Sequence, residues 1–115
     1  MLVGGLEAQN FIGAANLQPG QHILINGAGG SIGTMAIQLA KLQGAVVTAV
    51  DRADKLEFLK AVGADYTIDY QSEDYTKGET KYDAILDVVG KGHYGRGVKC
   101  LNPGGYYLIA NPSLP

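Results

Sequence analysis

A glycine-rich turn between an apolar segment and an amphipathic one constrains this 115-residue chain more than any other feature. Residues 22–26 contain an apolar run, Ile-Leu-Ile, with β-branched side chains, which predicts a strand buried on both faces. Residues 27–33 are mostly glycine, and beyond them apolar residues recur at helical spacing until Gly44. This order predicts a strand, a glycine turn and a helix. The free N–H groups of a helix N-terminus would then lie beside glycine backbone that carries no side chains. Such a place suits the binding of a phosphate.

Further strands and helices alternate along the chain. We expect a helix at 1–17, a strand at 45–50 ending at Asp51, a helix at 54–62, a strand at 66–70, a polar loop or one helical turn at 72–75, a strand at 84–89, a glycine-rich helix at 91–101, and a strand at 106–110 after a turn at 103–105. Because the strands are apolar throughout and helices separate them, they predict an α/β fold, a doubly wound parallel sheet of about five strands.

Ligands of a doubly wound sheet bind beyond the carboxyl ends of its strands, where the glycine turn would lie. Four residues of the turn are candidates for holding a pyrophosphate: Gly30, Ser31, Ile32 and Gly33. The turn departs from G-x-G-x-x-G and has the form A-x-G-x-x-G. Asp51 ends the next strand, where a carboxylate can accept hydrogen bonds from the ribose hydroxyls of a dinucleotide. The spacing therefore predicts a dinucleotide-binding site.

Composition excludes several other functions. A formal net charge of −2 predicts no nucleic-acid or anionic-membrane partner, and no apolar run approaches the ~20 residues of a membrane span. One cysteine, Cys100, and two histidines cannot form an internal disulfide or a usual metal site, and they fit a reducing, cytoplasmic setting. We assign no general acid, general base or nucleophile.

Charge is distributed unevenly along the chain. Residues 1–40 carry a single formal charge, Glu7, and all other charged residues lie between Lys41 and Lys99. A solvated surface usually carries charge throughout, so we expect a partner to cover part of this first third.

Six segments carry a resemblance to a known family. In order they are NGAGGSIG at 26–33, AIQLAK at 36–41, VGAD at 62–65, IDY at 68–70, YDAILD at 82–87 and LNPGG at 101–105. Together they resemble the medium-chain dehydrogenase/reductase superfamily, and most closely its quinone oxidoreductase and zinc-type alcohol dehydrogenase-like branch. The resemblance implies that residues 1–115 form the Rossmann NAD(P)-binding domain of an oxidoreductase, which positions the nicotinamide for hydride transfer.

The same resemblance implies that a GroES-like catalytic domain, which normally precedes this one, is absent. We therefore expect a truncated fragment without turnover of its own. Its partners would be the dinucleotide and either the missing catalytic domain or a second copy of the chain.

The resemblance also assigns cofactor contacts. Lys55 and Tyr70 match a pair that holds the 2′-phosphate of NADPH in reductases of this branch, whereas Asp51 matches the ribose-binding acid of NAD-using relatives. Arg52, beside Asp51, could offset the repulsion between that carboxylate and a phosphate, so NAD and NADP both remain open. A segment that includes Val89 and Gly90 resembles the one that lies beside the nicotinamide.

Two other functions remain as alternatives. One is a nucleotide-sensing module that uses the fold without redox chemistry. The other, ranked last, is an S-adenosylmethionine-dependent methyltransferase, which residues 102–105 before a strand suggest. Such enzymes usually end their first strand with an acidic residue, where this chain has Asn26.

Overall fold

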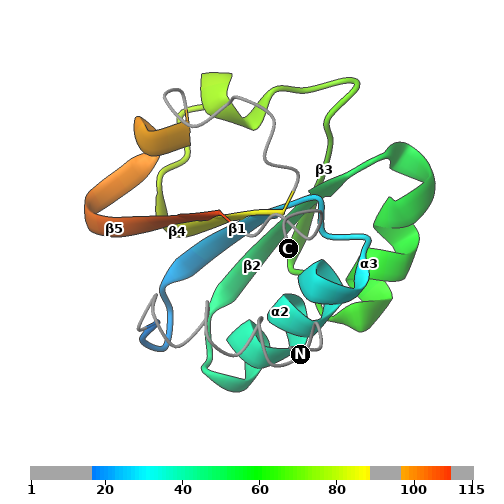
Figure 1. Ribbon diagram of the computed structural model, residues 1–115, viewed down its shortest axis with the longest axis horizontal. Helices are drawn as coiled ribbons and strands as arrows, with labels where there is room; N and C mark the ends of the chain where they lie inside the picture. Colours follow the sequence, from blue (N-terminus) through cyan, green and yellow to red (C-terminus); the bar gives the residue numbers. More distant parts are fainter. Residues whose placement is uncertain (1–16, 89–96, 110–115) are drawn as a thin grey trace.

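A five-stranded sheet forms the centre of the molecule, with strand order β3-β2-β1-β4-β5 and every neighbouring pair parallel (Figure 1). The computed structural model describes residues 17–88 and 97–109. The strands are β1 His22–Asn26, β2 Val46–Asp51, β3 Tyr66–Asp69, β4 Tyr82–Asp87 and β5 Leu101–Ile109, and the helices are α2 Ser31–Leu42 and α3 Leu56–Val62. This arrangement confirms the predicted α/β fold with a doubly wound parallel sheet of five strands.

The direction of winding reverses next to β1. The chain moves outward from β1 to β2 and β3 and then returns to place β4 on the other side of β1. The register pairs Asn26 with Val50 of β2 and with Asp87 of β4, so the carboxyl ends of these strands meet at one edge. Such a reversal is the usual ligand position in an open α/β sheet.

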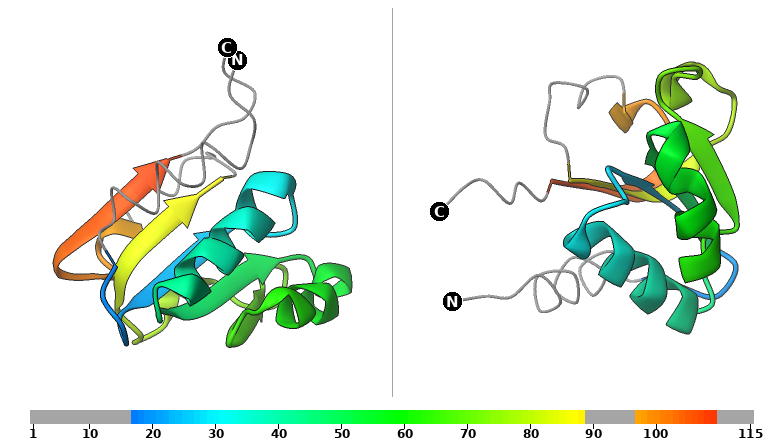
Figure 2. Two further views of the ribbon diagram at one scale, coloured as in Figure 1. Left: turned by 90° about the horizontal axis from the view of Figure 1, so that it is seen from below. Right: turned by 90° about the vertical axis from the view of Figure 1, so that its right-hand side faces the viewer.

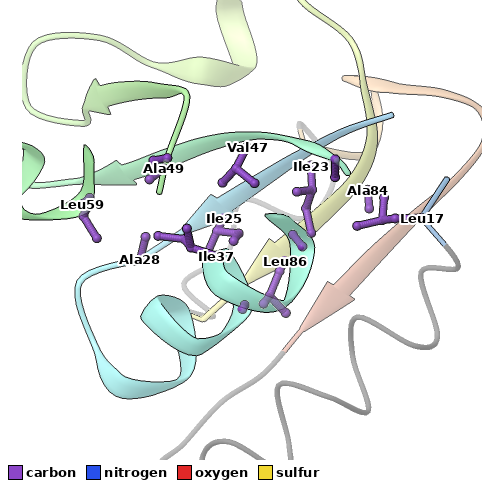
Figure 3. Close-up of a cluster of buried hydrophobic side chains, with 14 of the residues drawn as sticks. Leu17, Ile23, Ile25, Ala28, Ile37, Val47, Ala49, Leu59, Ala84 and Leu86 are labelled. Atoms are coloured by element: carbon purple, nitrogen blue, oxygen red, sulfur yellow. The ribbon is translucent and has the colours of Figure 1, made fainter. Parts of the chain in front are cut away.

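Both α-helices cover the same face of the sheet (Figure 2). Alternate residues of the central strands, among them Ile23, Ile25 and Val47, pack against α2 and α3 in one buried cluster (Figure 3). α2 contributes Ile37 and three neighbours at helical spacing, and α3 contributes Leu59. The cluster buries alternate residues of the strands and one stripe of each helix. This explains why the buried residues recur every second position in the strands and at helical spacing in the helices.

The opposite face of the sheet carries a second, smaller cluster. Leu24 and Ile85 of the central strands lie there with Tyr75, Tyr82 and Cys100. Tyr75 belongs to a single 3₁₀ turn, η2 Tyr75–Lys77, in the connection from β3 to β4. Cys100 is buried there as a small packed residue, and its Sγ lies 3.6 Å from the carbonyl oxygen of Thr76.

Several predicted boundaries were wrong by a few residues. The segment 54–62 begins as a 3₁₀ turn, η1 Ala53–Lys55, and is α-helical only from Leu56. The turn expected at 72–75 forms at η2 instead, where the side chain of Asp74 accepts a hydrogen bond from the N–H of Thr76. β4 begins at Tyr82, which is earlier than predicted.

The fifth strand differs most from expectation. It begins at Leu101, which pairs with Tyr82, and resumes pairing at Tyr106, opposite Ala84. The Pro-Gly-Gly segment therefore forms an irregularity within the strand, with Gly104 at φ 80°, rather than a turn before it. Of the expected helix at 91–101, the described part is helical at 97–98 and ends before Leu101, which already belongs to β5. The predicted helix at 1–17 and the ends of the strands at 89 and 110 lie outside the described residues, except for Leu17.

His22 at the start of β1 makes the stability of the fold depend on pH. Its ring Nε2 lies 2.6 Å from Thr48 Oγ1, and its backbone N–H donates to Asp83. Burial lowers the pKa of His22 from 6.5, although the carboxylates of Asp83 and Asp65 act in the opposite direction. The unfolded chain therefore binds the proton more readily. The free energy of unfolding should be highest above pH ~6.5 and fall as the pH drops through the lowered pKa.

Urea unfolding at pH about 7.5 and about 5.5 measures this effect. A His22→Gln variant should lose most of the difference between the two pH values. An unchanged difference in that variant would assign the pH dependence to other groups.

Candidate functional site

The glycine turn connects β1 to α2 and is tied to the end of β2. The N–H groups of Gly27 and Ala28 both donate to the carbonyl oxygen of Val50, at 2.9 and 3.1 Å. Gly27 has φ 84°, a conformation that favours glycine, and lets the chain leave the strand at this point. α2 then begins at Ser31, with Gly30 as its N-cap. The predicted strand, turn and helix are thus confirmed as one unit.

Gly33 lets α2 approach the turn closely. A Cβ at Gly33 would lie 2.5 Å from the Cα and 2.6 Å from the carbonyl oxygen of Ala28, which is itself buried. Gly30 is the opposite case, because a Cβ there meets nothing within 4 Å. Of the two predicted glycines, Gly33 therefore packs the helix against the turn, while Gly30 leaves open space above the helix N-terminus.

The N-terminus of α2 is available to an anion. Gly30 provides no side-chain cap, and the first turn contains no acidic residue. Ser31 is exposed at this end, whereas Ile32 is buried beneath the helix. The free N–H groups of the first turn and the helix dipole favour negative charge here, so Ser31 lies where a phosphate could reach it and Ile32 acts through packing.

Asp51 binds the glycine turn itself. Its Oδ2 accepts the N–H of Gly29 at 2.6 Å, and its Oδ1 accepts the N–H of Arg52 at 2.7 Å. A Cβ at Gly29 would lie 2.6 Å from that Oδ2. The sequence predicted only a ribose contact for Asp51. The parallel pairing of β1 with β2, which places the end of β2 beside the turn, explains this additional role.

Two cations and a tyrosine surround Asp51. Lys55 is half-buried, and its Cδ lies 3.3 Å from the position of a Cβ on Gly29. The exposed Arg52 guanidinium is 3.4 Å from a carboxylate oxygen of Asp54. Tyr70 follows β3 with its ring exposed, and its N–H donates to the carbonyl oxygen of Asp51 at 3.3 Å. The structure thus gathers Asp51, Arg52, Lys55 and Tyr70 at one end of β2 and β3.

A buried polar network, which the sequence did not predict, supports the ends of β1 and β4. Asp87, only 2% exposed, accepts the Tyr107 hydroxyl at 2.8 Å, and the amide of Asn26 lies 3.4 Å from its other oxygen. Burial, followed by the hydrogen bond to Asp87, raises the pKa of Tyr107 far above its usual value. The signal in the sequence is an aspartate that closes an apolar strand. Val89 and Gly90, predicted to contact the nicotinamide, lie outside the described residues.

Residues 31–110, well over half of the chain, match the protein family described as zinc-binding dehydrogenase. The chain belongs to the zinc-binding dehydrogenase family. The relatives and solved structures that it matches also confirm the resemblance to medium-chain reductases and alcohol dehydrogenases.

The chain has relatives among the reductases, one of which is named as an NAD(P)H oxidoreductase. It is 37% identical over 107 residues to 2-methylene-furan-3-one reductase of Solanum lycopersicum, covering 91% of this chain and 26% of the relative. It is 43% identical over 91 residues to the human mitochondrial NAD(P)H oxidoreductase RTN4IP1, covering 76% and 21% respectively.

Solved structures give the same result. The quinone oxidoreductase from Coxiella burnetii superposes with a TM-score of 0.88 at 32% identity, over 99% of this chain and 36% of that one. A thermostable alcohol dehydrogenase from Pyrobaculum aerophilum, with bound cobalt and zinc, gives 0.82 at 32% identity, over 95% and 32%. The chain therefore spans about a third or less of the length of these proteins.

The family name raises the question of zinc. Over residues 17–88 and 97–109, no group of three or more histidine, cysteine, aspartate or glutamate side chains could hold a metal ion. These residues do not fit a zinc site, and we derive no chemistry through zinc. In the same ranges, no helix has the length and apolar character needed to cross a membrane.

Proposed function

We propose that this chain is the dinucleotide-binding domain of an NAD(P)-dependent oxidoreductase and positions the nicotinamide for hydride transfer. The observation that carries the proposal is the open helix N-terminus at Gly30, held against the glycine turn by Gly33. The cofactor supplies the hydride, and the protein supplies binding, orientation and electrostatics.

The residues of the site fit the parts of a dinucleotide in order along the sheet edge. The first-turn N–H groups of α2, with Ser31 beside them, would hold the pyrophosphate. The adenosine ribose would lie toward the end of β2, near Asp51. The nicotinamide half would lie across β1 toward the end of β4, where the N–H of Val88 donates to the carbonyl oxygen of Asn26 and the chain continues to Val89 and Gly90.

Within this proposal, we favour NADP(H) over NAD(H). Both oxygens of Asp51 already accept backbone N–H groups, so ribose hydroxyls would compete for them. The ammonium of Lys55, in contrast, makes no hydrogen bond or ion pair with any residue in the described part of the chain, and its stem lies beside Gly29. A 2′-phosphate would give this cation a partner, with Arg52 and Tyr70 close by.

A lysine variant tests both the site and the choice of cofactor. Lys55→Ala should weaken NADPH binding about tenfold and leave NADH binding within about twofold, because only NADPH carries the phosphate. Calorimetric titration of the 115-residue chain with each cofactor measures this. Lys60→Ala, on the exposed side of α3, is the matched control and should change neither affinity. Equal losses for both cofactors would contradict the preference, and no binding of either at millimolar concentration would contradict the function.

The rest of the enzyme is part of the same proposal. Because the chain spans about a third of the quinone oxidoreductase structure that it matches, we propose that turnover needs a GroES-like catalytic domain, or a second copy, that brings the substrate to the nicotinamide. A cytoplasmic location is proposed on the basis of the lone cysteine.

A further inference from the structure

A cavity lies at the opposite end of the strands from the glycine turn. The connection between β3 and β4, residues 70–81, passes over the sheet face opposite α2 and α3 (Figure 1). It contains only the short turn η2, whose Tyr75 packs on the central strands. The first residues of β1, β2, β3 and β4 line a cavity of about 470 Å³ beside this connection.

Three aromatic rings form the wall of this cavity. The rings of His22 and Tyr82 meet edge to face, with centroids 4.8 Å apart, and His22 and Tyr66 lie 6.1 Å apart. The His22 ring is fixed by its contact of 2.6 Å with Thr48 Oγ1. Tyr82 is buried, whereas Tyr66 is 60% exposed and presents its ring to solvent at the cavity.

The charges around the cavity are negative. Among the described residues that line it, Glu73 is the only acidic one, and none is a lysine or an arginine. Asp65 and Asp83 lie close enough to oppose the lowering of the His22 pKa, and the nearby Lys41 is paired with Asp65 at 2.8 Å. Burial lowers the pKa of His22, which favours a neutral imidazole. The exposed Tyr66 ring and the Glu73 carboxylate, which pairs with no cation within residues 17–88 and 97–109, therefore border the space.

We propose that this cavity binds a small organic ammonium ion. The cationic nitrogen would lie against the exposed ring of Tyr66, and the Glu73 carboxylate would provide the counter-charge. Aromatic rings attract cations through their negative faces, and quaternary ammonium groups are the ligands best suited to such a wall. The proposal does not depend on the dinucleotide site, which lies at the carboxyl ends of the strands.

Titration of the isotope-labelled 115-residue chain with choline, followed by amide NMR shifts, tests this. We expect saturable shifts at Tyr66 and Glu73, with a dissociation constant in the range of about 1–10 mM. The neutral analogue 3,3-dimethylbutan-1-ol, in which carbon replaces the nitrogen, should bind at least about fivefold more weakly. Equal binding of the two compounds, or shifts that do not saturate, would overturn the proposal.

Variants at exposed positions separate ligand binding from folding. Tyr66→Leu should weaken choline binding about fivefold, while Tyr66→Phe, which keeps the ring, should stay within about twofold of the parent. Glu73→Gln should weaken it about threefold, less so at high salt. Tyr106→Leu, an exposed tyrosine outside the cavity, is the control. If Tyr66→Leu keeps the parent spectrum and the parent affinity for choline, the cavity is not a cation site.

Discussion

Replacing Gly33 with alanine is expected to destabilise the chain by about 3 kcal/mol and to abolish dinucleotide binding. The added methyl group would lie 2.5 Å from the Cα and 2.6 Å from the carbonyl oxygen of Ala28. Both of these Ala28 atoms belong to backbone that cannot rotate away. Either α2 moves away from the glycine turn or the turn distorts, and each change separates the helix N-terminus from the ends of β1 and β2. Urea unfolding gives the stability, and calorimetry with NADPH gives the binding.

Gly30→Ala is the matched control for this experiment. The added methyl group meets no atom within 4 Å, and the backbone at φ −88° accepts any residue. Stability should therefore fall by at most about 1 kcal/mol, the usual difference between glycine and alanine as an N-cap. NADPH binding should nevertheless weaken about tenfold, because the methyl group occupies the space proposed for the pyrophosphate. Equal free energies of unfolding for the two variants would show that close packing of Gly33 on Ala28 is not needed for the stability of the fold.

Replacing Asp87 with alanine is expected to cost about 3 kcal/mol of unfolding free energy. The change removes the acceptor of the half-buried Tyr107 hydroxyl, at 2.8 Å, and of the buried Asn26 amide, at 3.4 Å. Each donor is held by a strand and loses this hydrogen bond, and Asn26 is buried away from water. The loss should exceed that of a typical surface substitution several-fold.

Two variants show whether the hydrogen bonds or the side-chain volume matter. Asp87→Asn keeps the shape and one acceptor oxygen, so it should cost clearly less than alanine. Asp54→Ala, at an exposed position on η1, should stay within about 0.5 kcal/mol of the parent. Urea unfolding measures all three. A loss for Asp87→Ala no larger than that for Asp54→Ala would mean that the network does not stabilise the strand ends.

The part of the fold that the sequence predicted well depends on local patterns. β1, the glycine turn and α2 follow from one apolar run, a glycine cluster and a helical period, and each of these signals lies within a few residues of the element it specifies. β5 is an element whose beginning the local pattern does not predict. Pro103 and the two glycines after it look like a turn, yet pairing between Leu101 and Tyr82 begins before them. That pairing depends on a strand about twenty residues away, which no local pattern contains.

The same limit applies to the site. Asp51, Arg52, Lys55 and Tyr70 could be named from motif and resemblance, and the structure brings them together. The contact of Asp51 with Gly29 follows from the register of β1 and β2, and the contact of Asp87 with Tyr107 from that of β4 and β5. Both are consequences of strand pairing rather than of side-chain chemistry.

The central position of β1 determines when the site can form during folding. Asn26 and Asp87 are separated by 61 positions in the chain, and Gly29 and Asp51 by 22. Closing such long loops is slow compared with forming a helical turn, so the edge that faces the dinucleotide is complete only after β2 and β4 have both joined β1. A dinucleotide that binds this edge binds the finished sheet and not the isolated turn. By mass action it therefore stabilises all the central strands together.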